Sequence, residues 1–89
     1  MRYVLDDREK IFLDNAIDNF IITEDKLDLT GTSISPYNLR YALHDKDFKE
    51  EYFDNNSSDY WIRFSHEDSN FIMYFNAESF ELTLERERT

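Results

Sequence analysis

The sequence contains no cysteine, and it has only one glycine and one proline among its 89 residues. Without cysteine there can be no disulfide, thiolate metal site or cysteine nucleophile. With Gly31 as its single glycine, the chain has no glycine-rich loop that could hold a phosphate. No stretch approaches the roughly 20 apolar residues of a membrane span, and the first residues lack the apolar run of a signal peptide. We therefore expect one cytoplasmic domain, residues 1–89, that makes no membrane contact.

Basic residues are also scarce. Ten Lys and Arg accompany twenty Asp and Glu, which gives a net charge of −10 at pH 7. Such a charge repels nucleic acid and attracts basic proteins. We expect no direct binding of nucleic acid, and instead a basic protein partner, such as a nuclease or another nucleic-acid-binding protein. The alternative is that the charge serves solubility alone.

Three segments have helical patterns. A first helix is expected over 6–20, where Asp6 or Asp7 can cap its start. Its apolar side chains recur at steps of three and four, namely Phe12, Leu13, Ala16, Ile17 and Phe20. Ser35 and Pro36 form a typical helix start, so a second helix is expected over 36–44. Asp47 and Glu50 have the spacing of a capping box, which predicts a third helix over 47–54. Between the first two helices, residues 19–24 and 26–30 are expected to form short strands.

The last third of the chain predicts three antiparallel strands, at 60–65, 70–76 and 79–85. A turn over residues 66–69 places Phe64 opposite Phe71 and Ile62 opposite Met73. A second turn centred on Ala77 and Glu78 places three further apolar pairs on the same face, namely Phe75 with Phe80, Met73 with Leu82, and Phe71 with Leu84. A slip of one residue in either hairpin would destroy this agreement. The helices are expected to cover this face, which makes the fold class α+β, a two-layer sandwich.

The same register assigns an aromatic centre to the opposite face of the sheet. Trp61 is expected beside Tyr74, and Arg63 beside Ile72, with charged residues around them. Trp, Tyr and Arg are the residues most enriched in binding hot spots, so we interpret this face as a partner-binding surface. The alternative is that residues 20–34, or residues 3–5, fold over it.

Acidic side chains on the expected helices form a second candidate surface. Asp14 and Asp18 lie on the first helix, and the region of the third helix contributes Asp47, Glu50, Glu51 and Asp54. Carboxylates spaced along a rigid scaffold can imitate the phosphates of DNA and so occupy a basic cleft. The alternative is an ordinary solvated helix face, and Lys46 and Lys49 interrupt the run of acids.

Catalysis is not predicted. His66, Glu67 and Asp68 adjoin one another in an expected hairpin loop, where their side chains would diverge into solvent. His44 is expected at a helix C-terminus, where its cationic form suits the helix dipole. No calcium-loop spacing or nucleophile elbow is present, so no metal and no cofactor are expected.

Taken together, these patterns predict a small acidic inhibitor that occludes a basic surface of a partner protein. In composition the chain is similar to phage anti-defence (anti-restriction) proteins and to immunity proteins for nuclease toxins, although no motif identifies a family. The alternative hypothesis is a structural module that forms a homodimer through the face bearing Trp61 and Tyr74; the protein would otherwise be a monomer.

Overall fold

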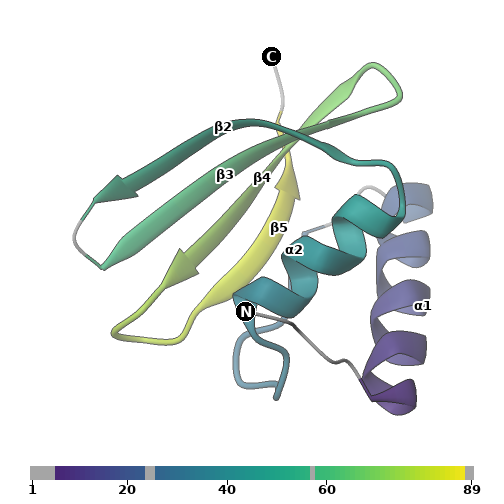
Figure 1. Cartoon of the computed structure of the whole chain (residues 1–89), viewed down its shortest axis with the longest axis horizontal. Helices are drawn as coiled ribbons and strands as arrows, with labels where there is room; N and C mark the ends of the chain where they lie inside the picture. The colour runs from purple at the N-terminus through teal and green to yellow at the C-terminus, as the bar shows by residue number, and fades with distance from the viewer. Residues whose placement is uncertain (1–5, 24–25, 57, 88–89) are drawn as a thin grey trace.

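The computed structural model describes residues 6–23, 26–56 and 58–87. It has an α+β fold in which two helices pack on one face of a five-stranded antiparallel sheet of order β1-β5-β4-β3-β2 (Figure 1). The elements in chain order are α1 (Asp7–Thr23), β1 (Leu27–Asp28), α2 (Pro36–Asp45), β2 (Lys49–Asn56), β3 (Asp59–His66), β4 (Ser69–Asn76) and β5 (Leu82–Arg86). The expected α+β class is confirmed, and the sheet has five strands instead of three.

Two of the three predicted helix starts are observed. The Asp6 carboxylate accepts a hydrogen bond from the Glu9 N–H at 2.9 Å, and the Ser35 hydroxyl accepts one from the Asn38 N–H at 3.1 Å. Each cap satisfies a backbone donor that the first turn leaves without a helical partner. The helix α1 continues to Thr23, so the strand expected over 19–24 is wrong, and the one expected over 26–30 is reduced to β1.

The core lies between the helices and the inner face of the sheet. Leu13, Ile17 and Phe20 of α1 and Leu39, Ala42 and Leu43 of α2 are buried against sheet residues that include Ile62, Phe64, Met73 and Leu84. Phe12 was expected in the apolar stripe, but it is exposed. The prediction that one face of β3 and β4 packs against the helices is therefore confirmed.

The helix expected over 47–54 is wrong, because these residues lead into and form β2. Asp47 has a φ of 67°, and this left-handed conformation turns the chain after α2. Phe48 then fills the core, with its ring 5.3 Å from Phe71. The next residues pair antiparallel with β3, with a bulge between Glu50 and Tyr52. A neighbouring strand that offers backbone hydrogen bonds has overridden a local helical signal.

The first predicted hairpin is confirmed residue for residue, and the second is shifted by two. In the first, Phe64 faces Phe71, Ile62 faces Met73 and Tyr60 faces Phe75. In the second, Phe75 faces Leu82, Met73 faces Leu84 and Phe71 faces Arg86. All three predicted pairs, Phe75 with Phe80, Met73 with Leu82 and Phe71 with Leu84, were therefore wrong.

The Asn76 side chain explains this shift. Its carbonyl oxygen accepts the N–H groups of Glu78 and Ser79 at 2.8 Å each, which lengthens the loop to residues 77–81 and leaves Phe80 exposed. Because side chains alternate with a period of two, a shift of two residues kept Leu82 and Leu84 on the inner face. Phe80 lies outside β5, and Arg86 is opposite Phe71.

Candidate functional site

The outer face of the sheet carries an aromatic pair at its centre. Trp61 on β3 and Tyr74 on β4 are direct cross-strand partners, and their ring centroids are 5.3 Å apart. The row across the sheet runs from Asp54 on β2 through Trp61, Tyr74 and Thr83 to Asp28 on β1. Both rings are only partly buried. The sequence therefore located the aromatic centre of this face correctly.

No second layer covers this face within the described part of the chain. Both helices lie on the inner face (Figure 1), and residues 27–28 pair with β5 at the edge of the sheet. Residues 26–34 thus extend the sheet or contribute Leu29 and Ile34 to the core. The alternative that residues 3–5 cover the face concerns a segment outside the described residues.

Carboxylates surround the aromatic pair, and we call this set the outer patch: Trp61, Ile72 and Tyr74 at the centre, with Asp28, Asp54, Asp59, Glu81 and Glu85 around them. A shallow hollow over the centre is lined by Trp61, Ile72 and Tyr74 together with Lys26, Glu81, Thr83 and Glu85. Thr83 forms its floor and is only 5% exposed. The outer patch thus combines an apolar surface with an excess of negative charge.

One end of the outer patch is held by a hydrogen-bond network around Asp59. Its carboxylate accepts the Tyr74 hydroxyl and the Asn76 amide, each at 2.7 Å. The bond to Asp59 raises the pKa of the Tyr74 hydroxyl, so the phenol stays protonated and the ring stays oriented. The Tyr74 ring therefore has little rotamer freedom left to lose on binding.

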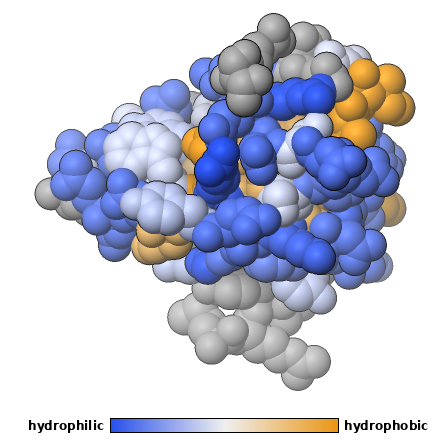
Figure 2. Space-filling model, turned by 90° about the horizontal axis from the view of Figure 1, so that it is seen from above, coloured by the Kyte–Doolittle hydropathy of each residue, from blue (hydrophilic) through white to orange (hydrophobic). Residues whose placement is uncertain are grey.

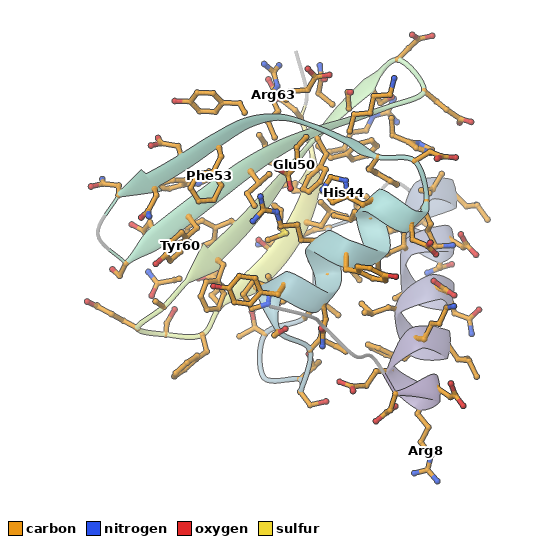
Figure 3. The ribbon with its side chains drawn as sticks, in the orientation of Figure 1. Arg8, His44, Glu50, Phe53, Tyr60 and Arg63 are labelled. Atoms are coloured by element: carbon orange, nitrogen blue, oxygen red, sulfur yellow. The ribbon has the colours of Figure 1, made fainter. Side chains whose placement is uncertain are left out.

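Arg63 lies on the same face but is engaged within the chain. Its Nη2 donates to the Glu87 carboxylate at 2.9 Å, while its Nε is buried without a hydrogen-bond partner among the described residues. Figure 3 shows the side chain at the upper edge of the sheet. The pair with Glu87 offsets the positive charge that Arg63 would otherwise bring to a basic partner.

The predicted acidic residues do not form one surface. Asp14 and Asp18 on α1 both face Lys46, whose Nζ is 3.9 Å and 2.9 Å from their oxygens, and the bond to Asp18 raises the pKa of Lys46. Of the acids expected on a third helix, Asp54 alone belongs to the outer patch, and Asp47 lies in the turn before β2.

Glu50 precedes the bulge in β2, and Glu51 is the extra residue within it. The Glu50 carboxylate points to the inner face and accepts hydrogen bonds from Arg40, which hold its pKa below the ordinary value. Its Oε1 also lies 2.9 Å from His44 Nε2, and Figure 3 shows these two side chains together. Glu51 accepts the Ser65 hydroxyl at 2.5 Å. The ladder of carboxylates that a helix over 47–54 would have presented is therefore absent from β2.

Neither histidine belongs to a catalytic arrangement among the described residues. His44 lies in the last turn of α2, as predicted, and contacts Glu50. His66 was expected to extend into solvent, but it ends β3 and stacks on Phe48, with ring centroids 4.2 Å apart. No group of three His, Asp or Glu side chains in the described ranges could hold a metal ion, and neither described helix has the length and apolar character to cross a membrane.

Comparisons with known proteins give no family for this chain: no family model matches it, and neither a curated protein nor a solved structure matches it significantly.

Proposed function

We propose that the protein is a small acidic binding protein whose outer patch occludes a basic surface of another protein. The observation that carries this proposal is the Trp61–Tyr74 pair, fixed at the centre of a sheet face that has no second layer among the described residues and is surrounded by carboxylates. An aromatic anchor inside a ring of charge is the usual composition of a binding hot spot. Figure 2 shows one face of the molecule, which is mostly hydrophilic, with hydrophobic side chains in separate small areas.

The two components of the patch would act at different stages of binding. The carboxylates attract a basic partner over several ångströms, which raises the association rate and makes it sensitive to salt. A partner Arg or Lys could then lie on the indole face of Trp61 while its charge is met by Glu81 or Glu85. This contact is desolvated only in the complex, so it governs the dissociation rate.

Inhibition follows from occlusion. A nuclease or other nucleic-acid-binding protein exposes the basic residues that this patch would attract, and a bound acidic domain would exclude their polyanionic ligand. We propose binding and not catalysis, because the outer patch contains no histidine: His44 contacts Glu50, which points to the inner face, and His66 stacks on Phe48.

A homodimer through the same face is less favoured by charge. The two aromatic centres would pack on each other, but the carboxylates around them would also be brought together. The dimer would have a net charge of −20, twice the −10 of one chain. We therefore propose a monomer, and sedimentation at two concentrations tests this directly. A dimer that Trp61→Glu dissociates would replace the inhibitor proposal with the assembly role.

Binding kinetics test the proposed function. Basic proteins retained from a lysate by the immobilised chain would be identified, purified and measured against Trp61→Ala and the matched control Tyr41→Ala, which removes an exposed aromatic from α2. Trp61→Ala should accelerate dissociation by about 30-fold, the equivalent of a 2 kcal/mol hot spot, and Tyr41→Ala should leave it unchanged. Glu85→Gln should slow association, most strongly at low salt. Binding that does not depend on salt, or that Tyr41→Ala weakens as much, would refute the proposal.

A further inference from the structure

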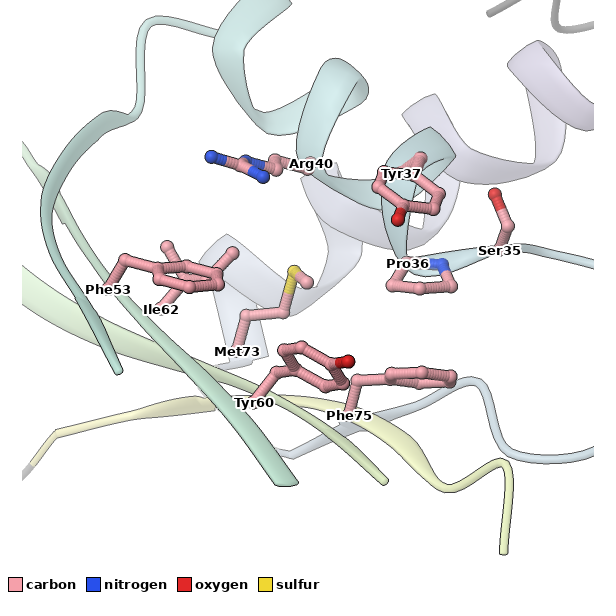
Figure 4. Close-up of a pocket in the computed structure, with 9 residues that line it drawn as sticks. All are labelled: Ser35, Pro36, Tyr37, Arg40, Phe53, Tyr60, Ile62, Met73 and Phe75. Carbon is pink, nitrogen blue, oxygen red and sulfur yellow. The ribbon is translucent and has the colours of Figure 1, made fainter. Parts of the chain in front are cut away.

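A second surface, on the opposite face of the sheet, has its own binding character. Beyond α2 the inner face is bare, and a groove of about 280 Å³ lies between the start of α2 and the sheet (Figure 4). We call it the inner groove; its walls are Pro36 and Tyr37 on one side and Phe53, Tyr60, Met73 and Phe75 on the other. Figure 3 shows Phe53 and Tyr60 on the part of the sheet that extends past the helix. The walls are mostly apolar and largely aromatic, with Ser35 and Arg40 as the polar lining residues, and such a site accommodates an apolar side chain.

The groove adjoins the open edge of the sheet. In the strand order β1-β5-β4-β3-β2, the eight-residue β2 is an edge strand whose described neighbour is β3 alone. Alternate N–H and C=O groups of such a strand point away from the sheet and can pair with an added strand. Phe53 belongs to both features, because it lies in β2 and its ring, 46% exposed, forms part of the groove wall. A segment that pairs with β2 would therefore have its inward side chains beside the groove.

Charge decides what kind of strand fits. Asp54 is among the outward side chains of β2, and Glu51 is the extra residue of its bulge. An added strand would therefore place its outward side chains near these carboxylates. A second copy of β2, paired antiparallel about Asp54, would bring the two Asp54 carboxylates opposite each other. Like charges directly opposite each other destabilise a sheet. The edge thus opposes self-pairing and favours a basic segment.

We infer that β2 and the inner groove together bind an extended peptide segment by strand addition, with basic side chains directed to the Asp54 side and an apolar side chain in the groove. The inference shares Asp54 with the outer patch but is distinguished from the proposed function by its groove, which lies on the face opposite the Trp61–Tyr74 pair. It adds a second mode of recognition, in which backbone pairing supplies affinity and the groove selects the side chain.

A synthetic peptide tests this inference. The probe is acetyl-Lys-Val-Lys-Leu-Lys-Val-Lys-amide, followed by amide chemical shifts of the ¹⁵N-labelled full chain. The shifts should concentrate in β2 and around the groove. The control peptide acetyl-Lys-Lys-Lys-Lys-Val-Leu-Val-amide has the same charge and composition without the alternation, and it should bind at least about tenfold more weakly. A probe N-methylated at alternate residues should lose binding to a similar degree, because it cannot donate to the edge.

Two surface variants separate the parts of the site without disturbing the core. Asp54→Lys should weaken the probe by up to about fivefold, as expected for an exposed charge pair, and Phe53→Ser should weaken it through the lost groove wall. Equal binding of both peptides, shifts spread over the whole acidic surface, or no shift in β2 at 1 mM probe would overturn the inference. Shifts at the groove alone, given equally by N-acetyl-leucine amide, would assign the groove to a small apolar ligand and would also overturn it.

Discussion

The hairpin between β3 and β4 allows a quantitative prediction. His66 pairs with Ser69, so the loop consists of Glu67 and Asp68 alone, with φ angles of 46° and 66°. Two positive φ angles define the type I′ turn, which prefers Asn-Gly. A residue with a β-carbon in this left-handed region costs about 1–2 kcal/mol, less for Asp, which tolerates it. Glu67 is therefore the more strained of the two.

Replacing the pair by Asn-Gly should stabilise the protein. The substitution relieves backbone strain at both positions. Glycine offsets roughly 0.5–1 kcal/mol of this relief, because it raises the conformational entropy of the unfolded chain. The free energy of unfolding should therefore rise by about 1 kcal/mol. For a domain of this size that corresponds to a rise in Tm of about 4–8 °C. Urea denaturation followed by the fluorescence of Trp61, the single tryptophan, measures the same change as a higher midpoint at constant slope.

The control is the Glu67→Ala/Asp68→Ala variant. It removes the same two negative charges from a chain of net charge −10 but retains both β-carbons, so it should be no more stable than the original protein. If Ala-Ala stabilised as much as Asn-Gly, the gain would come from charge, and the argument from backbone conformation would be refuted. No gain from Asn-Gly would refute the assignment of the turn.

Two further predictions concern Phe80 and Glu50. Phe80 is 69% exposed at a φ of 60°, so Phe80→Gly should be about 1 kcal/mol more stable than Phe80→Ala in the same urea assay; equal stability would contradict the strained backbone. Hydrogen bonds from Arg40 and His44 lower the pKa of Glu50. The ionised carboxylate therefore stabilises the folded protein at pH values above its pKa in the unfolded chain, which is near the ordinary 4.5. This contribution is lost as the pH falls through the lower pKa that Glu50 has in the folded protein. The deficit of Glu50→Gln should accordingly be largest near neutral pH and shrink below about pH 4; a constant deficit would show that ionisation plays no part.

Local signals in the sequence were sufficient for several elements. Ser35–Pro36 and Asp6 specify helix starts through short side-chain contacts with the next turn. The alternation in β3 and β4 assigned Ile62 and Met73 to the core and Trp61 and Tyr74 to the outer face. This assignment survived an error of two residues in the second hairpin, because only an odd shift exchanges the faces of a strand.

What the sequence by itself determined is thus the α+β class, the starts of both helices and the two faces of β3 and β4, since each depends on contacts between near neighbours or on a simple period. The tertiary structure alone decided that residues 49–56 pair with β3, which in turn directs Glu50 to Arg40, separates the acids expected on one helix and leaves a groove beside an open edge. These features depend on which distant segments offer hydrogen bonds and buried area, and a local pattern such as the capping-box spacing of Asp47 and Glu50 contains no record of them.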